Sequence, residues 1–136
     1  MLETRAFKKF IQVYQKSDVI FEEKSTGKEM YVIYSGKVKL ATSAPGKEVV
    51  LARLGPGEFF GEMALVDAAP RTAKATAEQD DTQLAVLDQD KFLYLVSQQP
   101  AFVLTIMHEF CQRIRKRWIL YSELFEKPAE KGGAPD

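Results

Sequence analysis

The residues that this sequence lacks exclude several chemistries. It has one cysteine, Cys111, so no disulfide can form within the chain. It has one histidine, His108, which cannot supply the clustered ligands that zinc sites use. No acid–base pair or activated nucleophile stands in a recognisable catalytic arrangement. We therefore expect no metal site, no cofactor and no enzymatic activity, and we expect the protein to work in a reducing, cytoplasmic compartment.

Long apolar runs and an excess of one charge are also missing. Nineteen basic and nineteen acidic side chains leave no net charge, so no global field draws the chain to nucleic acid or to an anionic membrane. No segment reaches the length of a membrane span or of a signal peptide. A basic cluster between Arg113 and Arg117 is interpreted as a solvated helix face. We expect no specific DNA binding by this chain alone and no membrane association.

What is present fits one globular domain. A chain of 136 residues with 46% apolar side chains can bury one core but is too short for two full-sized domains. The last ten residues are polar and rich in proline and glycine. We expect a folded domain over residues 1–126 and a disordered tail over 127–136.

The apolar pattern changes twice along the chain. Residues 5–15 carry apolar side chains at helical spacing and predict a short N-terminal helix. Residues 19–87 consist of short runs rich in Val, Ile, Tyr and Thr that are broken by turn residues, which is typical of an antiparallel β protein. Ser35-Gly36 predicts a tight hairpin and Ala44-Pro45-Gly46 a second turn. The last two strands are predicted near 73–78 and 82–87.

Helical periodicity returns after Asp88. Pro100 separates a predicted helix at 89–98 from a longer one at 101–125. On the long helix one continuous face is apolar. It consists of Val103, Met107, Phe110, Cys111, Ile114, Trp118, Tyr121 and Phe125. Leu120 and Leu124 lie off this face, so the last turns are apolar on more than one side.

The stretch from Phe60 to Ala73 has the parts that a sugar phosphate needs. Gly61 lets the backbone come close to a ligand, and Glu-Met-Ala-Leu begins a short helix whose free N–H groups favour an anion. Glu62 can accept hydrogen bonds from sugar hydroxyls. Arg71 supplies a permanently charged fork that is suited to phosphate.

This stretch resembles the phosphate-binding cassette of cyclic nucleotide-binding domains. The resemblance rests on Gly61-Glu62, Ala64-Leu65 and Pro70-Arg71-x-Ala73, and it extends over roughly residues 5–125. This family includes catabolite-activator-like regulators, the regulatory subunits of cyclic-AMP-dependent kinase, and cyclic-nucleotide-gated channels. The chain departs from the family pattern in two turns, around Ser17-Asp18 and at Glu23-Lys24-Ser25.

The resemblance implies a mainly β fold with flanking helices. It would be an antiparallel β-roll of jelly-roll type with an N-terminal helix, a short cassette helix and two C-terminal helices. It implies a non-catalytic sensor that binds cyclic AMP or cyclic GMP. The residues implied to contact the ligand are Gly61, Glu62, Met63, Ala64, Arg71 and Thr72. A threonine directly after the arginine is associated in the family with tolerance of guanine.

The family also implies how binding is signalled. Ligand draws the cassette and the C-terminal helices together, and Trp118, Tyr121 or Phe125 could close over the base as a lid. Since few residues follow Phe125, we expect no helix-turn-helix domain in this chain. The sensor would then act on a separate effector protein, form a homodimer through its C-terminal helix, or belong to a larger polypeptide. An alternative is an interaction or dimerisation scaffold whose nucleotide pocket is unused.

Overall fold

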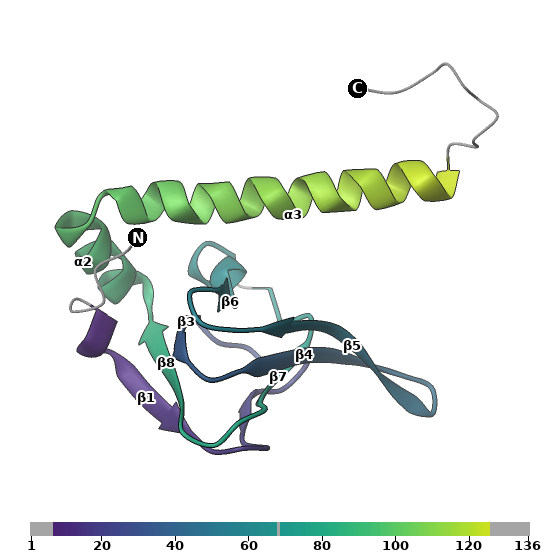
Figure 1. The fold of residues 1–136 in the computed structure, drawn as a ribbon, viewed down its shortest axis with the longest axis horizontal. Coiled ribbons are helices and arrows are strands. Elements are labelled where there is room, and N and C mark those ends of the chain that lie inside the picture. The colour runs from purple at the N-terminus through teal and green to yellow at the C-terminus, as the bar shows by residue number, and fades with distance from the viewer. Residues whose placement is uncertain (1–6, 68, 126–136) are drawn as a thin grey trace. The chain divides into compact units, whose positions relative to one another are not determined.

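A computed structural model describes residues 7–67 and 69–125, so the predicted tail lies outside the described residues. The chain divides into two compact units, the first ending at Gln99 and the second beginning at Pro100. Among the described residues, the first unit contains the eight strands, the 3-10 helix η1 and helix α2, and the second contains the long helix α3 (Figure 1).

Two antiparallel sheets of four strands each make up the first unit. One sheet has the order β1-β8-β3-β6, in which β1 is Ile11–Tyr14, β8 is Thr82–Leu87, β3 is Met30–Ser35 and β6 is Phe59–Phe60. The other has the order β2-β7-β4-β5, in which β2 is Val19–Phe21, β7 is Lys74–Ala77, β4 is Val38–Ala44 and β5 is Lys47–Leu54. The predicted β fold and its last two strands are confirmed.

The core is made by the inward-facing residues of both sheets. Strands place alternate side chains on opposite faces, so each sheet contributes every second residue. The buried cluster consists of Tyr31, Ile33, Val38, Phe60, Ala75 and Leu84. Burying a large apolar side chain stabilises the fold by about 1.5–3 kcal/mol. This cluster therefore accounts for much of the driving force that holds the sheets together.

The predicted N-terminal helix is wrong over residues 11–14. Residues 7 and 8 are helical and Phe10 closes a turn onto Phe7, but Ile11–Tyr14 form β1. This strand pairs with β8, from Ile11 opposite Ala85 to Tyr14 opposite Thr82. The open edge of β8 offers backbone partners to a segment with two β-branched residues, and this long-range pairing outweighs a local helical pattern.

The hairpin predicted at Ser35-Gly36 is also wrong, because β3 and β4 belong to different sheets. Gly36, with φ of 97°, turns the chain from one sheet into the other. The turn at Pro45-Gly46 does form a hairpin, in which Ala44 pairs with Lys47. Proline followed by a glycine with φ of 76° suits a tight two-residue turn.

Both predicted C-terminal helices are confirmed. Helix α2 is Gln89–Gln98, and the carboxylate of Asp88 caps it by accepting a 2.9 Å hydrogen bond from the backbone N–H of Lys91. Helix α3 is Ala101–Phe125. Pro100 separates them, since proline cannot continue the hydrogen-bonding pattern of a preceding helix.

Two glycine substitutions test the crossing between the sheets. In Gly36→Ala the new Cβ would lie 2.7 Å from the backbone Cα of Thr82, which cannot move without disturbing β8. In Gly46→Ala the φ is also positive, but no atom lies within 4 Å of the new Cβ. We expect Gly46→Ala to lose about 1–2 kcal/mol of unfolding free energy from backbone strain alone. Gly36→Ala should lose about 1–3 kcal/mol more unfolding free energy than Gly46→Ala, because its Cβ also meets the backbone of Thr82.

Urea unfolding monitored by circular dichroism would measure both losses. Equal losses in the two variants would contradict the close contact between Gly36 and Thr82.

Candidate functional site

The cassette begins with a left-handed residue. Gly61 has φ of 76° and ψ of 10°, and it leads into the single 3-10 turn η1, Glu62–Leu65. Only glycine adopts this conformation without strain. The short helix predicted from Glu-Met-Ala-Leu is therefore present, in the tighter 3-10 form. Its first-turn acidic residue is Glu62, one oxygen of which is buried.

Arg71 follows the cassette turn and is 7% exposed. Its Nη1 donates to the carbonyl of Gly61 at 3.2 Å, and its Nη2 donates to the carbonyl of Glu29 at 2.9 Å. The Nε is buried and makes no hydrogen bond within the described part of the chain. A guanidinium has five N–H donors. The two bonds therefore fix its orientation and leave further donors, including Nε, for an anion.

Aromatic rings line one side of the guanidinium. The Cζ of Arg71 lies 4.2 Å from the ring centre of Phe21 and 5.9 Å from that of Tyr31. Tyr31 in turn stacks on Phe60, with the ring centres 5.1 Å apart and the planes at 10°. The two distances from Arg71 to the ring centres are typical of cation–π contacts, which contribute about 0.5–2 kcal/mol depending on desolvation. The arginine thus rests on side chains that also form the core.

Two glycines make room for the guanidinium. A Cβ on Gly27 would lie 2.7 Å from Nη2 of Arg71, and one on Gly61 would lie 2.9 Å from Nη1. The backbone of Arg71 is bound to the same loop as Gly27, because its N–H donates to the carbonyl of Ser25 at 2.8 Å. The loop between β2 and β3 therefore forms a wall of the site.

Glu29 is the acidic neighbour of Arg71 in this loop. Its Oε1 lies 4.0 Å from Nη2, and its side chain is 42% exposed. At this distance and exposure the ion pair is weak. Gly27, Glu29 and Phe21 were missed by the sequence analysis, since they lie in another segment and no local spacing connects them to Arg71.

Tyr31 is held in its neutral form. Burial, with smaller contributions from Tyr14 and Glu29, raises the pKa of its phenol to about 12, and Arg71 opposes the shift. The phenol therefore stays protonated over the physiological pH range. Within the described residues, the carboxylate of Glu29 is a formal negative charge that lies 4.0 Å from the guanidinium.

The other predicted site residues lie either beside Gly61 and Arg71 in the chain or on the long helix. Met63 and Thr72 are exposed, and Ala64 is partly buried. Trp118 lies on α3 in the second unit and is 47% exposed. The side chains of Tyr121 and Phe125 lie outside the described part of the chain. Among the predicted site residues, Gly61 and Arg71 are joined directly by the hydrogen bond from Nη1 of Arg71 to the Gly61 carbonyl.

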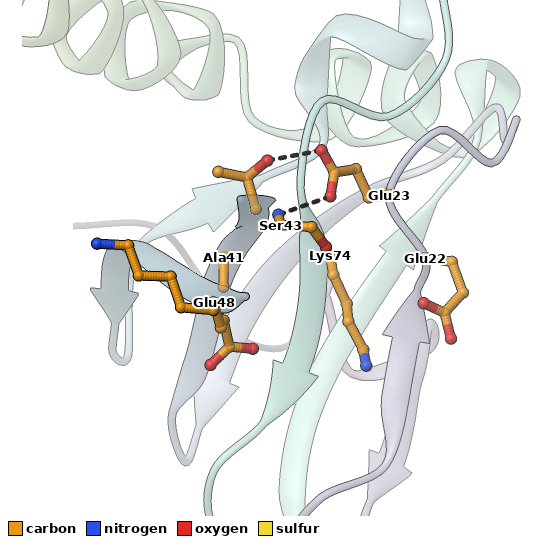
Figure 2. A pocket seen from close by; sticks show the side chains of 8 residues that line it. Glu22, Glu23, Ala41, Ser43, Glu48 and Lys74 are labelled. Carbon is orange, nitrogen blue, oxygen red and sulfur yellow. Dashed lines mark hydrogen bonds between the residues drawn. The ribbon is translucent and has the colours of Figure 1, made fainter. Parts of the chain in front are cut away.

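A cavity of about 330 Å³ lies elsewhere, over β4, β5 and β7. Its lining is mostly charged and does not include the cassette. Figure 2 shows the carboxylate of Glu23 turned toward β4, where it accepts hydrogen bonds from the Thr42 hydroxyl at 2.6 Å and the Ser43 N–H at 3.0 Å. These bonds tie the segment after β2 to β4, which is separated from β2 by β7 in the same sheet, so this cavity wall serves the structure of the roll.

The Thr42 hydroxyl, followed by the Ser43 amide, lowers the pKa of the Glu23 carboxyl. Because the folded pKa is the lower one, these bonds stabilise the fold above the ordinary glutamate pKa of 4.5. That stabilisation is lost as the pH falls through the folded pKa. We expect Thr42→Val to raise the pKa of Glu23 and to flatten this part of the acid-unfolding curve.

An NMR pH titration of the side-chain carboxyl carbons would measure this shift. Ser43→Ala is the matched control, because it keeps the backbone N–H and should move the pKa less. A Glu23 pKa that is the same in Thr42→Val and in the unchanged protein would show that the hydroxyl does not stabilise the carboxylate.

Two kinds of site were not found within residues 7–67 and 69–125. No group of three or more His, Cys, Asp or Glu side chains is placed to hold a metal ion. No helix there is long and apolar enough to cross a membrane.

The fold is a β-roll in which two backbone carbonyls and the ring of Phe21 hold a buried arginine. Residues 11–99 match the family model of the cyclic nucleotide-binding domain. The chain therefore belongs to the cyclic nucleotide-binding domain family. The resemblance on which the sequence analysis relied is confirmed.

The relatives are regulators and kinases. The chain is 37% identical to the cyclic AMP receptor protein of Thermus thermophilus over 106 residues, which are 77% of this chain and 49% of that protein. It is 33% identical to human cGMP-dependent protein kinase 2 over 60% of this chain and 11% of the kinase. The crystal structure of the Thermus thermophilus catabolite activator protein matches with a TM-score of 0.76 and 34% identity. That match covers 88% of this chain and 57% of the activator. The chain thus spans about half the length of the first of these relatives.

Proposed function

We propose that this chain is a non-catalytic sensor that binds a cyclic mononucleotide. The observation that carries the proposal is the buried guanidinium of Arg71. Two carbonyls hold it, and its Nε makes no hydrogen bond within the described residues. The ion pair between this guanidinium and Glu29 is weak, because the Glu29 side chain is 42% exposed and the atoms are 4.0 Å apart. A phosphate diester supplies the anionic oxygens that such a fork binds well. Family membership supports the same ligand class.

The ribose would lie beside Glu62. This residue begins η1 directly after Gly61, whose carbonyl already binds Arg71. A carboxylate there can accept hydrogen bonds from sugar hydroxyls, and the backbone from Gly61 to Ala64 can approach the phosphate closely. Charge-assisted hydrogen bonds contribute about 1.5–3 kcal/mol each. A few of them account for micromolar binding.

Preference for cyclic AMP or cyclic GMP would depend on the residues that contact the base. The relatives include proteins named for each nucleotide, so both are candidates. Thr72 is exposed next to Arg71, and its hydroxyl can meet the 2-amino group of guanine, which adenine lacks. We infer that the affinity for cyclic GMP is comparable to the affinity for cyclic AMP.

Signalling would use the C-terminal helix. Trp118 on α3 is half-exposed and can stack on a purine, a contact that contributes about 1–3 kcal/mol. Tyr121 and Phe125 are the alternative lid residues. Ligand would then shift the population of α3 between two arrangements, read by an effector protein or by a second copy of the chain.

Removal of the arginine tests the proposal directly. We expect Arg71→Ala to bind cyclic AMP and cyclic GMP about 2–5 kcal/mol more weakly, as for other truncated charged pairs. Arg71→Lys keeps the charge but not the fork, and its loss should be intermediate. Isothermal titration calorimetry measures the affinity, and circular dichroism checks that each variant is folded. An unchanged affinity in a folded Arg71→Ala would end the proposal.

A subtler variant moves the arginine without removing it. Gly27→Ala would push a methyl group against Nη2 and Cζ of Arg71, at 2.7 and 3.3 Å. Since the guanidinium must shift, we expect the affinity for the nucleotide to fall about tenfold, or 1.4 kcal/mol. Gly55→Ala is the matched control, because it has no neighbour within 4 Å. A nucleotide affinity that falls equally in both variants would show that the position of the guanidinium does not matter.

A further inference from the structure

Lysines and aromatic rings gather where β1 begins and α2 passes beside it. We call Lys8, Lys9, Phe10, Lys91 and Tyr94 the lysine–aromatic patch. The Nζ of Lys9 donates to the Tyr94 hydroxyl at 2.9 Å and lies 4.8 Å from the centre of that ring. The Nζ of Lys91 lies 5.5 Å from the ring centre of Phe10. None of these residues belongs to the cassette.

The two rings fix the positions of the two ammonium groups. Phe10 and Tyr94 meet edge to face at 89°, with their centres 6.1 Å apart. Tyr94 is fixed on α2, and the carbonyl of Phe10 accepts the Val86 N–H at 3.0 Å. Lys9 and Lys91 are therefore held over rings that are themselves anchored, and they lose less rotamer freedom on binding than free lysines do.

The positive charge of the patch is not neutralised within the described part of the chain. Lys8, Lys9 and Lys91 are exposed, and none of them forms an ion pair there. The acidic neighbours on α2 are Asp88 and Asp90. The Asp88 carboxylate caps the helix through the Lys91 N–H. A lysine has three donors, and Lys9 uses one of them on Tyr94, so donors remain for a carboxylate.

We propose that the lysine–aromatic patch docks an acidic segment of a partner protein. The charge is positive, and the exposed ring of Tyr94 suits an apolar side chain between carboxylates. Three lysines are too few for the counterion release that drives tight nucleic-acid binding. They are also fewer than the basic clusters that bind anionic lipid. A short acidic peptide matches the size of the patch and its charge.

A labelled peptide tests the docking site. The peptide repeats two glutamates and one phenylalanine, and its control replaces every glutamate by glutamine. We expect the acidic peptide to bind in fluorescence anisotropy, with an affinity that falls as salt is added. Amide NMR shifts should change around residues 8–10 and 91–94. Binding of the glutamine peptide at equal affinity would overturn the proposal.

Charge reversal locates the contact. Lys9→Glu combined with Lys91→Glu should weaken peptide binding about tenfold or more. The matched control reverses two exposed lysines that lie outside the patch, Lys16→Glu with Lys47→Glu, and should change the affinity by no more than about twofold. Both double variants should keep their circular dichroism spectrum and their affinity for cyclic nucleotide.

An equal loss of peptide affinity in the two double variants would reduce the effect to net charge and refute the patch. Tighter binding of a duplex DNA oligonucleotide or of phosphatidylserine vesicles through Lys9 and Lys91 would also refute it, because the occupant would then belong to another class.

Discussion

Burying a permanently charged guanidinium is costly unless its faces meet polar or aromatic partners. Arg71 meets this requirement with carbonyls from Gly61 and Glu29 and with the ring of Phe21. These partners lie in the cassette, in the loop before β3 and on β2. One side chain thus connects three segments that are far apart in sequence. A ligand that binds Arg71 therefore acts on all three at once.

The site and the core share their residues. Tyr31 and Phe60 stack within the buried cluster, and Tyr31 also lies beside the guanidinium. The glycines at 27 and 61 leave the space that the arginine fills. The site around Arg71 is consequently rigid on its aromatic side and closely packed on its backbone side. Such preorganisation lowers the entropic cost of holding a phosphate.

Strand β8 connects the two regions for which we propose binding. It pairs with β3, which carries Tyr31, and with β1, next to which the lysine–aromatic patch begins. It then leads through Asp88 into α2, which carries Lys91 and Tyr94. A nucleotide site and a protein-docking surface can therefore share one sheet while using different side chains. Each can be altered without removing the other.

The sequence by itself determined the class of fold, the two C-terminal helices and the cassette with Arg71, because periodicity, proline and a contiguous motif are local signals. Only the tertiary structure decided that Ile11–Tyr14 are a strand and that Gly36 joins two sheets. It alone also supplied Gly27, Glu29 and Phe21 as neighbours of Arg71. These features depend on pairing and packing between distant segments, and such contacts leave no spacing that can be read along the chain.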